Sequence, residues 1–452
     1  MGKYFGTDGF RGEAGRQLTA YHAFRIGQLL GYYLKNEKNE KPRAVIGKDT
    51  RLSCYMLEYA IASGLASVGA DSYMLHVTTT PSVSYVTRTD KFDIGIMISA
   101  SHNPYYDNGI KILNSKGEKI NDALTDKIEK YLDVRESVPM AQGMDIGKIV
   151  DYYEGRNRYI GYLISLAKSS FKGYRVGLDL ANGSCHMIAR SVFEALGATV
   201  FVINHQPSGT NINENAGSTH IENLQALVKG QRLDVGFAFD GDGDRCIAVD
   251  NDGEVVNGDK IMYLLAKDLK ERGELLTNTV VTTVMSNLGL YQALDKEGIK
   301  YEKTNVGDRF VYESIWKNGH SLGGEESGHI ILSKYATTGD GILTAIKIMD
   351  ILADKKQSLS YLLRKITLLP QSTLNIRVKN KSDALNNERL KSLCASIEKE
   401  LSGNGRLLLR ASGTEPKIRI MIEAESKEKI ESYFERIQAV IKGEFLNEQT
   451  DH

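Results

Sequence analysis

One pattern recurs three times along this chain and restricts it to a small set of folds. A short apolar strand, a polar loop, an amphipathic helix, a glycine turn and a second strand follow one another, starting at residues 43–51, 174–183 and 279–287. Apolar residues that repeat every three or four positions and then meet a glycine indicate a helix and its C-terminal cap. Strands that alternate with helices predict parallel βαβ units and therefore an α/β fold.

Each copy is followed by another apolar strand that ends abruptly in polar residues. These segments are 93–104, 234–245 and 320–329. Because ligands of open α/β sheets bind beyond the carboxyl ends of the strands, we expect the three loops to face one central cleft.

The last part of the chain has a different pattern. From about Leu369 a strand, a helix, two strands near 406–410 and 417–424 and a final helix indicate a small α+β domain. The 452 residues also exceed the roughly 250–300 at which a single core stops growing. We therefore predict three similar mixed-sheet α/β domains and a C-terminal α+β domain. Their limits are 1–150, 151–255, 256–368 and 369–452.

Composition excludes several classes of protein. Lys+Arg and Asp+Glu number 57 each, which argues against nucleic-acid binding driven by bulk charge. The four cysteines are far apart and form no CxxC pair, so they read as free thiols in a reducing compartment. No segment approaches the roughly 18 apolar residues of a membrane span, and the N-terminus has no signal-peptide core. We expect a cytoplasmic protein without nucleic-acid or membrane partners.

The strongest local signal is a triplet of carboxylates, Asp240, Asp242 and Asp244, at the end of an apolar strand. Glycines between them remove side-chain bulk, so the three groups can converge on one hard cation such as Mg²⁺ or Ca²⁺. An EF-hand is excluded because Arg245 and Asn251 occupy the positions where that loop needs Gly and Glu. An acidic surface turn is the alternative.

A second signal is Ser101, beside His102 at another strand end. This serine could be a nucleophile or an ordinary turn residue, and no GxSxG elbow surrounds it to suggest an esterase. Lys111 could return a cation to the same cleft, or it could be solvated.

Two further loops have a composition suited to phosphosugars. Between Arg410 and Arg419, a glycine turn with hydroxyl groups could form an anion site, or it could be a plain hairpin turn. The segment 324–329 offers carboxylate, hydroxyl and imidazole groups that could bind sugar hydroxyls or an amine, or form a polar turn. Arg11 could contact a phosphate.

Taken together, five motifs resemble those of the α-D-phosphohexomutases, in the same order and over nearly the whole chain. They are KYFGTDGFRG, ISASHNPYYDNGIK, FDGDGDR, GGEESGH and RASGTEPKIR. The segments 47–58, 80–88, 286–290 and 306–311 resemble the branch that acts on glucosamine phosphates more than the branch that acts on mannose phosphates.

The resemblance implies a role for each candidate residue. Ser101 would carry the phosphate, with His102, Lys111, Arg11 and Arg245 as the other catalytic residues. One Mg²⁺ per chain would be held by the phosphoserine at position 101 and the three aspartates. The implied substrate-binding residues are Glu325, Ser327, His329, Arg410, Ser412, Gly413, Thr414 and Arg419.

The implied reaction converts glucosamine 6-phosphate to glucosamine 1-phosphate, a step towards UDP-N-acetylglucosamine and cell-wall precursors. It would pass through a phosphoserine enzyme, with glucosamine 1,6-bisphosphate as intermediate and activator. A mannose or glucose phosphate mutase, a metal-dependent phosphatase and a non-catalytic phosphosugar-binding protein stay open as alternatives. The oligomeric state, for which a homodimer is one possibility, is also left open. Relatives often carry Lys where this chain has Asn305, so no role is assigned there.

Overall fold

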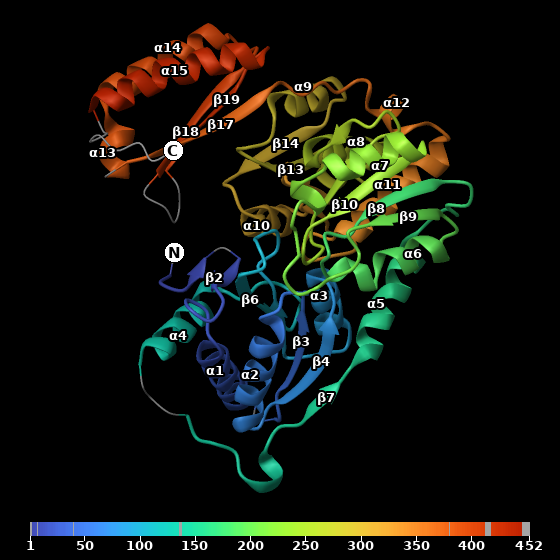
Figure 1. The fold of residues 1–452 in the computed structure, drawn as a ribbon, viewed down its shortest axis with the longest axis vertical. Helices are drawn as coiled ribbons and strands as arrows, with labels where there is room; N and C mark the ends of the chain where they lie inside the picture. Colours follow the sequence, from blue (N-terminus) through green and yellow to red (C-terminus); the bar gives the residue numbers. More distant parts are fainter. Residues whose placement is uncertain are drawn as a thin grey trace. The chain divides into compact units, whose positions relative to one another are not determined.

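The structure, a computed structural model, describes residues 2–6, 8–38, 40–134, 138–378, 380–411 and 417–444 (Figure 1). The chain divides into two compact units. The first contains Met1–Met285 and Ile299–Arg364, and the second contains Ser286–Gly298 and Lys365–His452.

The first unit contains three sheets that share one arrangement. In each sheet a central strand pairs in parallel with the next two strands of its repeat. In the first sheet, β3 (Arg43–Lys48) lies between β4 (Asp71–Val77) and β5 (Ile94–Ile98). In the second, β8 (Arg175–Asp179) lies between β9 (Thr199–Ile203) and β10 (Val235–Phe239). In the third, β13 (Thr279–Thr283) lies between β14 (Lys300–Thr304) and β15 (Leu322–Gly324).

A fourth strand then pairs antiparallel with the third in every sheet. These strands are β6 (Asp107–Asn114), β11 (Cys246–Val249) and β16 (Ile330–Leu332). Strands β1 (Phe5–Gly6), β2 (Gly9–Glu13) and β7 (Ile149–Asp151) extend the first sheet, and β12 (Val255–Val256) extends the second. The predicted mixed-sheet α/β fold is therefore confirmed. The polar loop of each repeat lies at the same topological position, between its third and fourth strands.

Helices connect and cover these strands. The crossover helices of the three repeats are α2 (Cys54–Ser67), α6 (Ala189–Ala195) and α9 (Leu288–Lys296). Of these three, α2 and α6 lie in the first unit. That unit also contains α1 (Ala20–Lys38), α3 (Thr80–Thr89), α4 (Asp122–Asp133), α5 (Tyr153–Leu166), α7 (Glu222–Gln231), α8 (Gly258–Glu271), α10 (Asp308–Asn318), α11 (Gly341–Lys355) and α12 (Leu359–Leu363). Short 3₁₀ turns are η1 (Gly143–Asp145), η2 (Ser184–Met187), η3 (Gly217–Thr219) and η4 (Leu276–Asn278).

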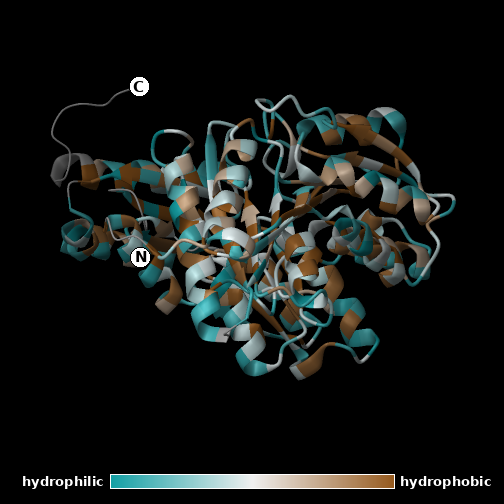
Figure 2. Ribbon diagram, turned by 90° about the horizontal axis from the view of Figure 1, so that it is seen from below, coloured by the Kyte–Doolittle hydropathy of each residue, from teal (hydrophilic) through white to brown (hydrophobic). Residues whose placement is uncertain are grey.

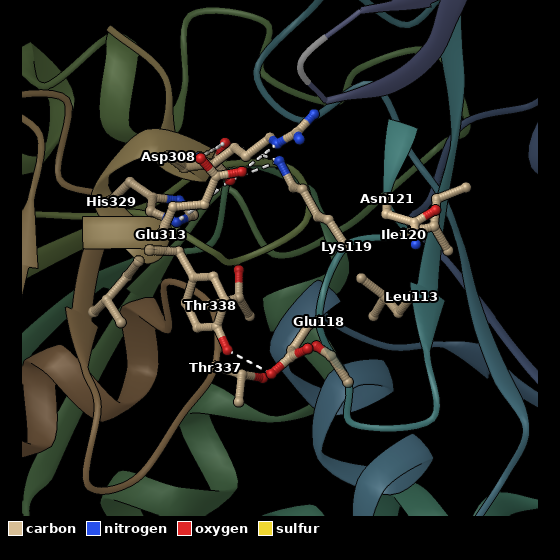
Figure 3. A pocket seen from close by; sticks show the side chains of 14 residues that line it. Leu113, Glu118, Lys119, Ile120, Asn121, Asp308, Glu313, His329, Thr337 and Thr338 are labelled. Atoms are coloured by element: carbon tan, nitrogen blue, oxygen red, sulfur yellow. Dashed lines mark hydrogen bonds and ion pairs between the residues drawn. The ribbon is translucent and has the colours of Figure 1, made fainter. Parts of the chain in front are cut away.

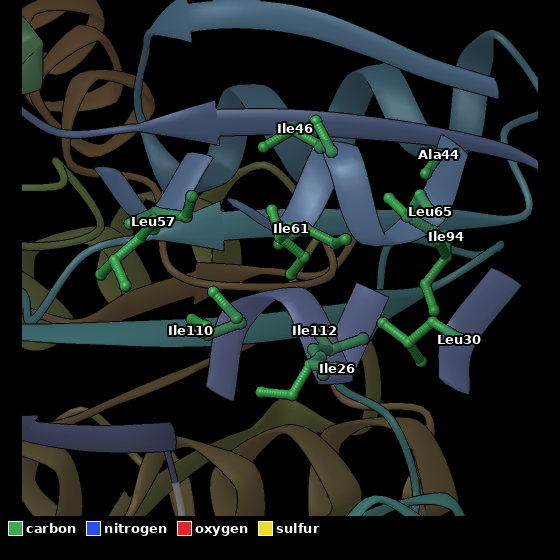
Figure 4. Packing of buried hydrophobic residues seen from close by; sticks show 14 of the residues in the cluster. Ile26, Leu30, Ala44, Ile46, Leu57, Ile61, Leu65, Ile94, Ile110 and Ile112 are labelled. Atoms are coloured by element: carbon green, nitrogen blue, oxygen red, sulfur yellow. The ribbon is translucent and has the colours of Figure 1, made fainter. Parts of the chain in front are cut away.

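A large core lies between the first sheet and helices α1 and α2. Ile46 and Ile110 on the strands pack against Ile61 on α2, all fully buried (Figure 4). Burying each such side chain contributes about 1.5–3 kcal/mol. The two helices approach so closely that a Cβ at Gly64 would lie 2.1 Å from the Phe24 carbonyl oxygen. This core fixes the strand ends that carry the first polar loop.

The second unit is a three-stranded antiparallel sheet with helices. Its strands are ordered β17 (Gln371–Arg377), β19 (Lys417–Glu423) and β18 (Arg406–Ala411), and its further helices are α13 (Lys381–Asn386), α14 (Glu388–Leu401) and α15 (Lys427–Glu444). Helix α9 belongs to this unit. The Asn287 amide donates to the Leu369 carbonyl at 2.9 Å, and the Leu288 N–H donates to Glu423 Oε2 at 2.8 Å.

Apolar residues occupy the strands and alternate with hydrophilic residues along the helices (Figure 2). All four cysteines are free and buried, as their spacing predicted. Within the described part of the chain, none of the helices combines the length and apolarity needed to span a bilayer.

Candidate active site

Ser101 follows β5 in a strained loop. Its φ is +53°, in the left-handed region that residues other than glycine rarely adopt, and its side chain is buried. Such a conformation persists where the surroundings fix it. Here the Ser101 N–H donates to Ser99 Oγ at 2.9 Å, and Ser99 Oγ donates to Asp49 Oδ2 at 2.6 Å.

Arg51 binds the backbone of the loop that carries Ser101. This role was not predicted from the sequence. The residue is 1% exposed, and its Nε donates to Asp49 Oδ2 at 2.8 Å. Its other nitrogens donate to four main-chain carbonyls of the loop, those of Ser101, Asn103, Pro104 and Asp107. The buried arginine therefore determines where the Ser101 hydroxyl points.

The structure brings that hydroxyl to the aspartate triplet between β10 and β11. Ser101 Oγ donates to Asp240 Oδ2 at 2.5 Å, and carboxylate oxygens of all three aspartates lie within 4.8 Å of one another. The two loops touch along their backbones, because a Cβ at Gly241 would lie 2.5 Å from the Ser101 carbonyl oxygen. Residues 139 positions apart thus share one site.

The charges of the triplet fit a hard cation. Burial, Asp244 and Asp242 raise the pKa of Asp240 well above its usual range. Burial also disfavours ionised Asp244, but Lys111 and His329 hold the pKa of that carboxyl below its usual range. Oδ1 of Asp242 and Oδ1 of Asp244 are buried without a hydrogen-bond partner. Such orphaned acceptors are costly, and an oxygen-only donor set is what Mg²⁺ prefers.

Lys111 lies on β6 and points into the same acidic cluster. Its Nζ is 2.7 Å from Asp242 Oδ2, 3.0 Å from Asp8 Oδ2 and 3.4 Å from Asp244 Oδ2. Burial alone would lower the pKa of Lys111, but these carboxylates raise it well above its ordinary value. The group is therefore an ammonium ion in this environment.

His102 has the opposite electrostatic environment. Its Nδ1 lies 3.4 Å from Ser101 Oγ, and burial together with Arg245 and Arg11 lowers the pKa of His102 to about 4. The imidazole is therefore neutral at pH 7. Arg245 Nε lies 3.9 Å from Asp244 Oδ1, so Arg245 borders the triplet. Arg11 forms an ion pair with Asp8, which also contacts Lys111.

The loop between β15 and β16 meets the triplet through His329. Its Nδ1 lies 3.7 Å from Asp244 Oδ2, while its Nε2 accepts the Gly339 N–H at 3.0 Å. Glu325 Oε1 accepts the Gly307 N–H at 3.1 Å, just before α10. Ser327 Oγ is buried without a hydrogen-bond partner.

Behind this loop is a cavity of about 180 Å³ (Figure 3). Leu113, Glu118 and Lys119 line it from the segment around β6, and Asp308 and His329 line it from the opposite side. Lys119 Nζ lies 2.7 Å from Asp308 Oδ2 across the cavity edge and 2.7 Å from Asp8 Oδ1.

In the second unit, Arg410 on β18 lies directly opposite Arg419 on β19. Burial and the Arg419 charge lower the pKa of Arg410. Like charges placed opposite each other destabilise a strand pair, so an anion here would relieve the repulsion. The predicted partners Ser412, Gly413 and Thr414 lie outside the described residues.

Four family models match the chain in succession. They describe α/β/α domains I, II and III and the C-terminal domain of phosphoglucomutase/phosphomannomutase, over residues 2–138, 157–253, 257–368 and 374–440. The chain belongs to the phosphohexomutase family. The resemblance of its five motifs is thereby confirmed, and each of the loops described above falls within a different one of the four matched segments.

Relatives of this phosphohexomutase match it from end to end. The phosphoglucosamine mutase of Lachnospira eligens is 57% identical over 444 residues, covering 98% of this chain and 99% of the relative. A family protein of known structure from Burkholderia thailandensis is 23% identical with a TM-score of 0.80, covering 98% of both chains. Aspergillus fumigatus N-acetylphosphoglucosamine mutase, solved with GlcNAc-6P and magnesium, is 18% identical with a TM-score of 0.68, covering 97% of this chain and 95% of that one. The two structures establish the shared fold.

Proposed function

We propose that this phosphohexomutase interconverts glucosamine 6-phosphate and glucosamine 1-phosphate by way of a phosphorylated Ser101. The observation that carries the proposal is the 2.5 Å contact between Ser101 Oγ and Asp240 Oδ2, at the centre of the buried carboxylate triplet. The name of the full-length relative favours glucosamine phosphates over the mannose and glucose phosphates of the alternative.

Asp240, Asp242 and Asp244 would hold one Mg²⁺ together with an oxygen of phosphoserine 101. Their unpartnered buried oxygens and oxygen-only chemistry support this assignment. Phosphoserine carries roughly −1.5 to −2 charges at pH 7, which three neighbouring carboxylates alone would repel. When bound, the cation supplies charge neutralisation and polarises the phosphoryl group.

The surrounding side chains divide the proton transfer between them. Neutral His102 can accept the proton of the attacking sugar hydroxyl, and the Lys111 ammonium can donate one to the oxygen that leaves. Arg11 and Arg245 place positive charge beside the transferred group, where negative charge spreads in the transition state. Glu325, Ser327 and His329 would bind the sugar.

Two transfers complete the isomerisation. Phosphoserine 101 first gives its phosphate to the free hydroxyl of the substrate, forming glucosamine 1,6-bisphosphate. The intermediate then turns, and its other phosphate returns to the serine, so phosphate ester is conserved. The phosphate that is not reacting needs a second anion site, which we assign to Arg410, Arg419 and the loop with Ser412, Gly413 and Thr414. Three earlier expectations stay predictions: the domain limits at 150, 255 and 368, the cytoplasmic location and the homodimer.

The decisive experiment compares the wild-type enzyme with Ser101→Ala. Both are assayed on glucosamine, mannose and glucose 6-phosphates with the matching 1,6-bisphosphate, and intact mass is recorded. We expect a preference for the glucosamine substrate, one added phosphate on the wild type, none on the variant, and an activity loss of at least about 10³-fold. A variant that keeps most of its activity would overturn the covalent route, and net phosphate release would indicate a phosphatase.

A further inference from the structure

A closed ring of alternating acidic and basic side chains joins the aspartate triplet to the loop of residues 324–329, called the sugar loop below. Each member contacts the next at 2.7–3.7 Å, and the last contacts the first. In order, the members are Asp244, Lys111, Asp8, Lys119, Asp308 and His329.

Local structure explains how two lysines reach the same aspartate. Lys111 lies on β6, and the chain then turns back so that Leu113 and Lys119 form an antiparallel bridge. Both ammonium groups thereby reach Asp8, with Lys111 on Oδ2 at 3.0 Å and Lys119 on Oδ1 at 2.7 Å. Burial disfavours an ionised Asp8, yet Lys111, Lys119 and Arg11 hold its pKa well below the usual range.

The other half of the ring starts at helix α10. Asp308 is the first residue of that helix, and its Oδ2 lies 2.7 Å from Lys119 Nζ and 3.7 Å from His329 Nε2. The preceding residue, Gly307, donates its N–H to Glu325. Asp308 is therefore attached to the sugar loop through both its side chain and its neighbour's backbone.

We propose that Lys119 and Asp308 are positioning residues that couple the sugar loop to Lys111. The inference rests on the proposed function. Lys119 binds two carboxylates that each hold a site residue, Asp8 holding Lys111 and Asp308 facing His329. A displacement of about 1 Å at a reacting group can lower a rate about 100-fold, so loss of this link reduces turnover even though Lys119 is not a catalytic residue.

Two single variants and their combination test the proposal. Lys119→Met and Asp308→Asn each lower kcat about 10- to 100-fold and change KM for glucosamine 6-phosphate by less than about threefold. Because the two side chains act as one unit, the double variant is about as slow as the slower single variant. Lys119→Arg keeps the cation and recovers most of the lost rate. The phosphorylation of dephosphorylated enzyme by glucosamine 1,6-bisphosphate, followed by intact mass, slows to a similar degree.

A matched control lies at the same junction. Asp122, at the start of α4, pairs with Arg309 on α10, with Nη2 3.0 Å from Oδ2, but its side chain is 73% exposed and it contacts no ring member in the pairs described. Asp122→Asn should therefore change kcat by less than twofold. The proposal is overturned if Lys119→Met has wild-type kcat, if Asp122→Asn loses as much rate, or if the two single losses multiply in the double variant. If Ser101→Ala is inactive while Lys119→Met keeps the wild-type kcat, only this inference is rejected. The proposed function is then unaffected.

Discussion

A single buried guanidinium determines the shape of the loop that carries Ser101. Ser101 has a backbone conformation that is unfavourable for serine, and the four carbonyl oxygens bound by Arg51 are what hold the loop around it. Arg51 is itself held by Asp49, which also accepts the Ser99 hydroxyl. The geometry of Ser101 therefore depends on Arg51 and Asp49, which lie outside the triplet.

Replacing Arg51 with Met should damage both stability and activity. The change leaves Asp49 as a buried charge without its cation, which destabilises by about 3–5 kcal/mol. It also frees the loop, so we expect kcat to fall about 100-fold or more. Thermal unfolding and steady-state kinetics measure the two effects. The control is Arg190→Met, since Arg190 pairs with Glu194 on the surface of α6 and an exposed pair contributes at most about 1 kcal/mol. Equal melting temperatures for Arg51→Met and wild type would refute this account of the loop.

The sequence indicated the candidate site residues better than the residues that support them. The three aspartates could be recognised from chemistry visible over a few neighbouring positions, and Ser101 could be recognised through the resemblance of its motif. Lys119 and Asp308 could not, because their pairing joins positions 189 residues apart. Arg51 had a weaker signal. It follows the first strand of the first repeat, in GKDTR, and the rule that strand ends carry site residues applies there too.

At the scale of elements, the site is built from one hairpin used three times. The loops between β5 and β6, β10 and β11, and β15 and β16 supply Ser101, the triplet and His329 in turn. Hydrophobic periodicity was sufficient to predict the strand before each loop, because buried strands are recognisable from short local windows. The antiparallel strand after each loop was not predicted. The same signal did not indicate that crossover helix α9 packs within the second unit, since its contacts with Leu369 and Glu423 are 82 and 135 residues away.

Close contact between two of these hairpins requires a residue without a side chain at position 241. A Cβ there would lie 2.5 Å from the Ser101 carbonyl oxygen and 2.8 Å from Ile212 Cδ1. Gly241→Ala should therefore push the loops apart, destabilising by about 1–3 kcal/mol and lowering kcat about 10- to 100-fold.

The control for this substitution is Gly230→Ala on α7, where an added Cβ would meet nothing within 4 Å. Alanine favours a helix by about 0.8–1 kcal/mol relative to glycine, so this variant should melt slightly higher and keep its activity. Melting temperatures and kcat of both variants decide the matter. If Gly241→Ala behaves like Gly230→Ala, the two loops do not need their close contact.

At the scale of the whole molecule, the residues proposed for the chemistry and those proposed for the second anion site belong to different units. The first unit contains Ser101, the triplet and the sugar loop, and the second contains Arg410 and Arg419. A bisphosphate intermediate has two phosphates, and only one can react at a time. The proposed reaction therefore predicts that the two units contribute to different kinetic constants.

Arg419→Ala tests that division. Loss of a charged hydrogen-bond donor to the non-reacting phosphate should weaken binding by about 1.5–3 kcal/mol, which raises KM for glucosamine 6-phosphate about 10- to 100-fold. The effect on kcat should be smaller, because the groups around Ser101 are unchanged. The control, Arg436→Ala, removes a cation from α15 of the same unit, where it pairs with Glu400 at the surface. Arg436→Ala should leave KM within twofold of wild type. If Arg419→Ala lowers kcat and leaves KM unchanged, Arg419 acts in the transfer step and the second anion site must be sought elsewhere.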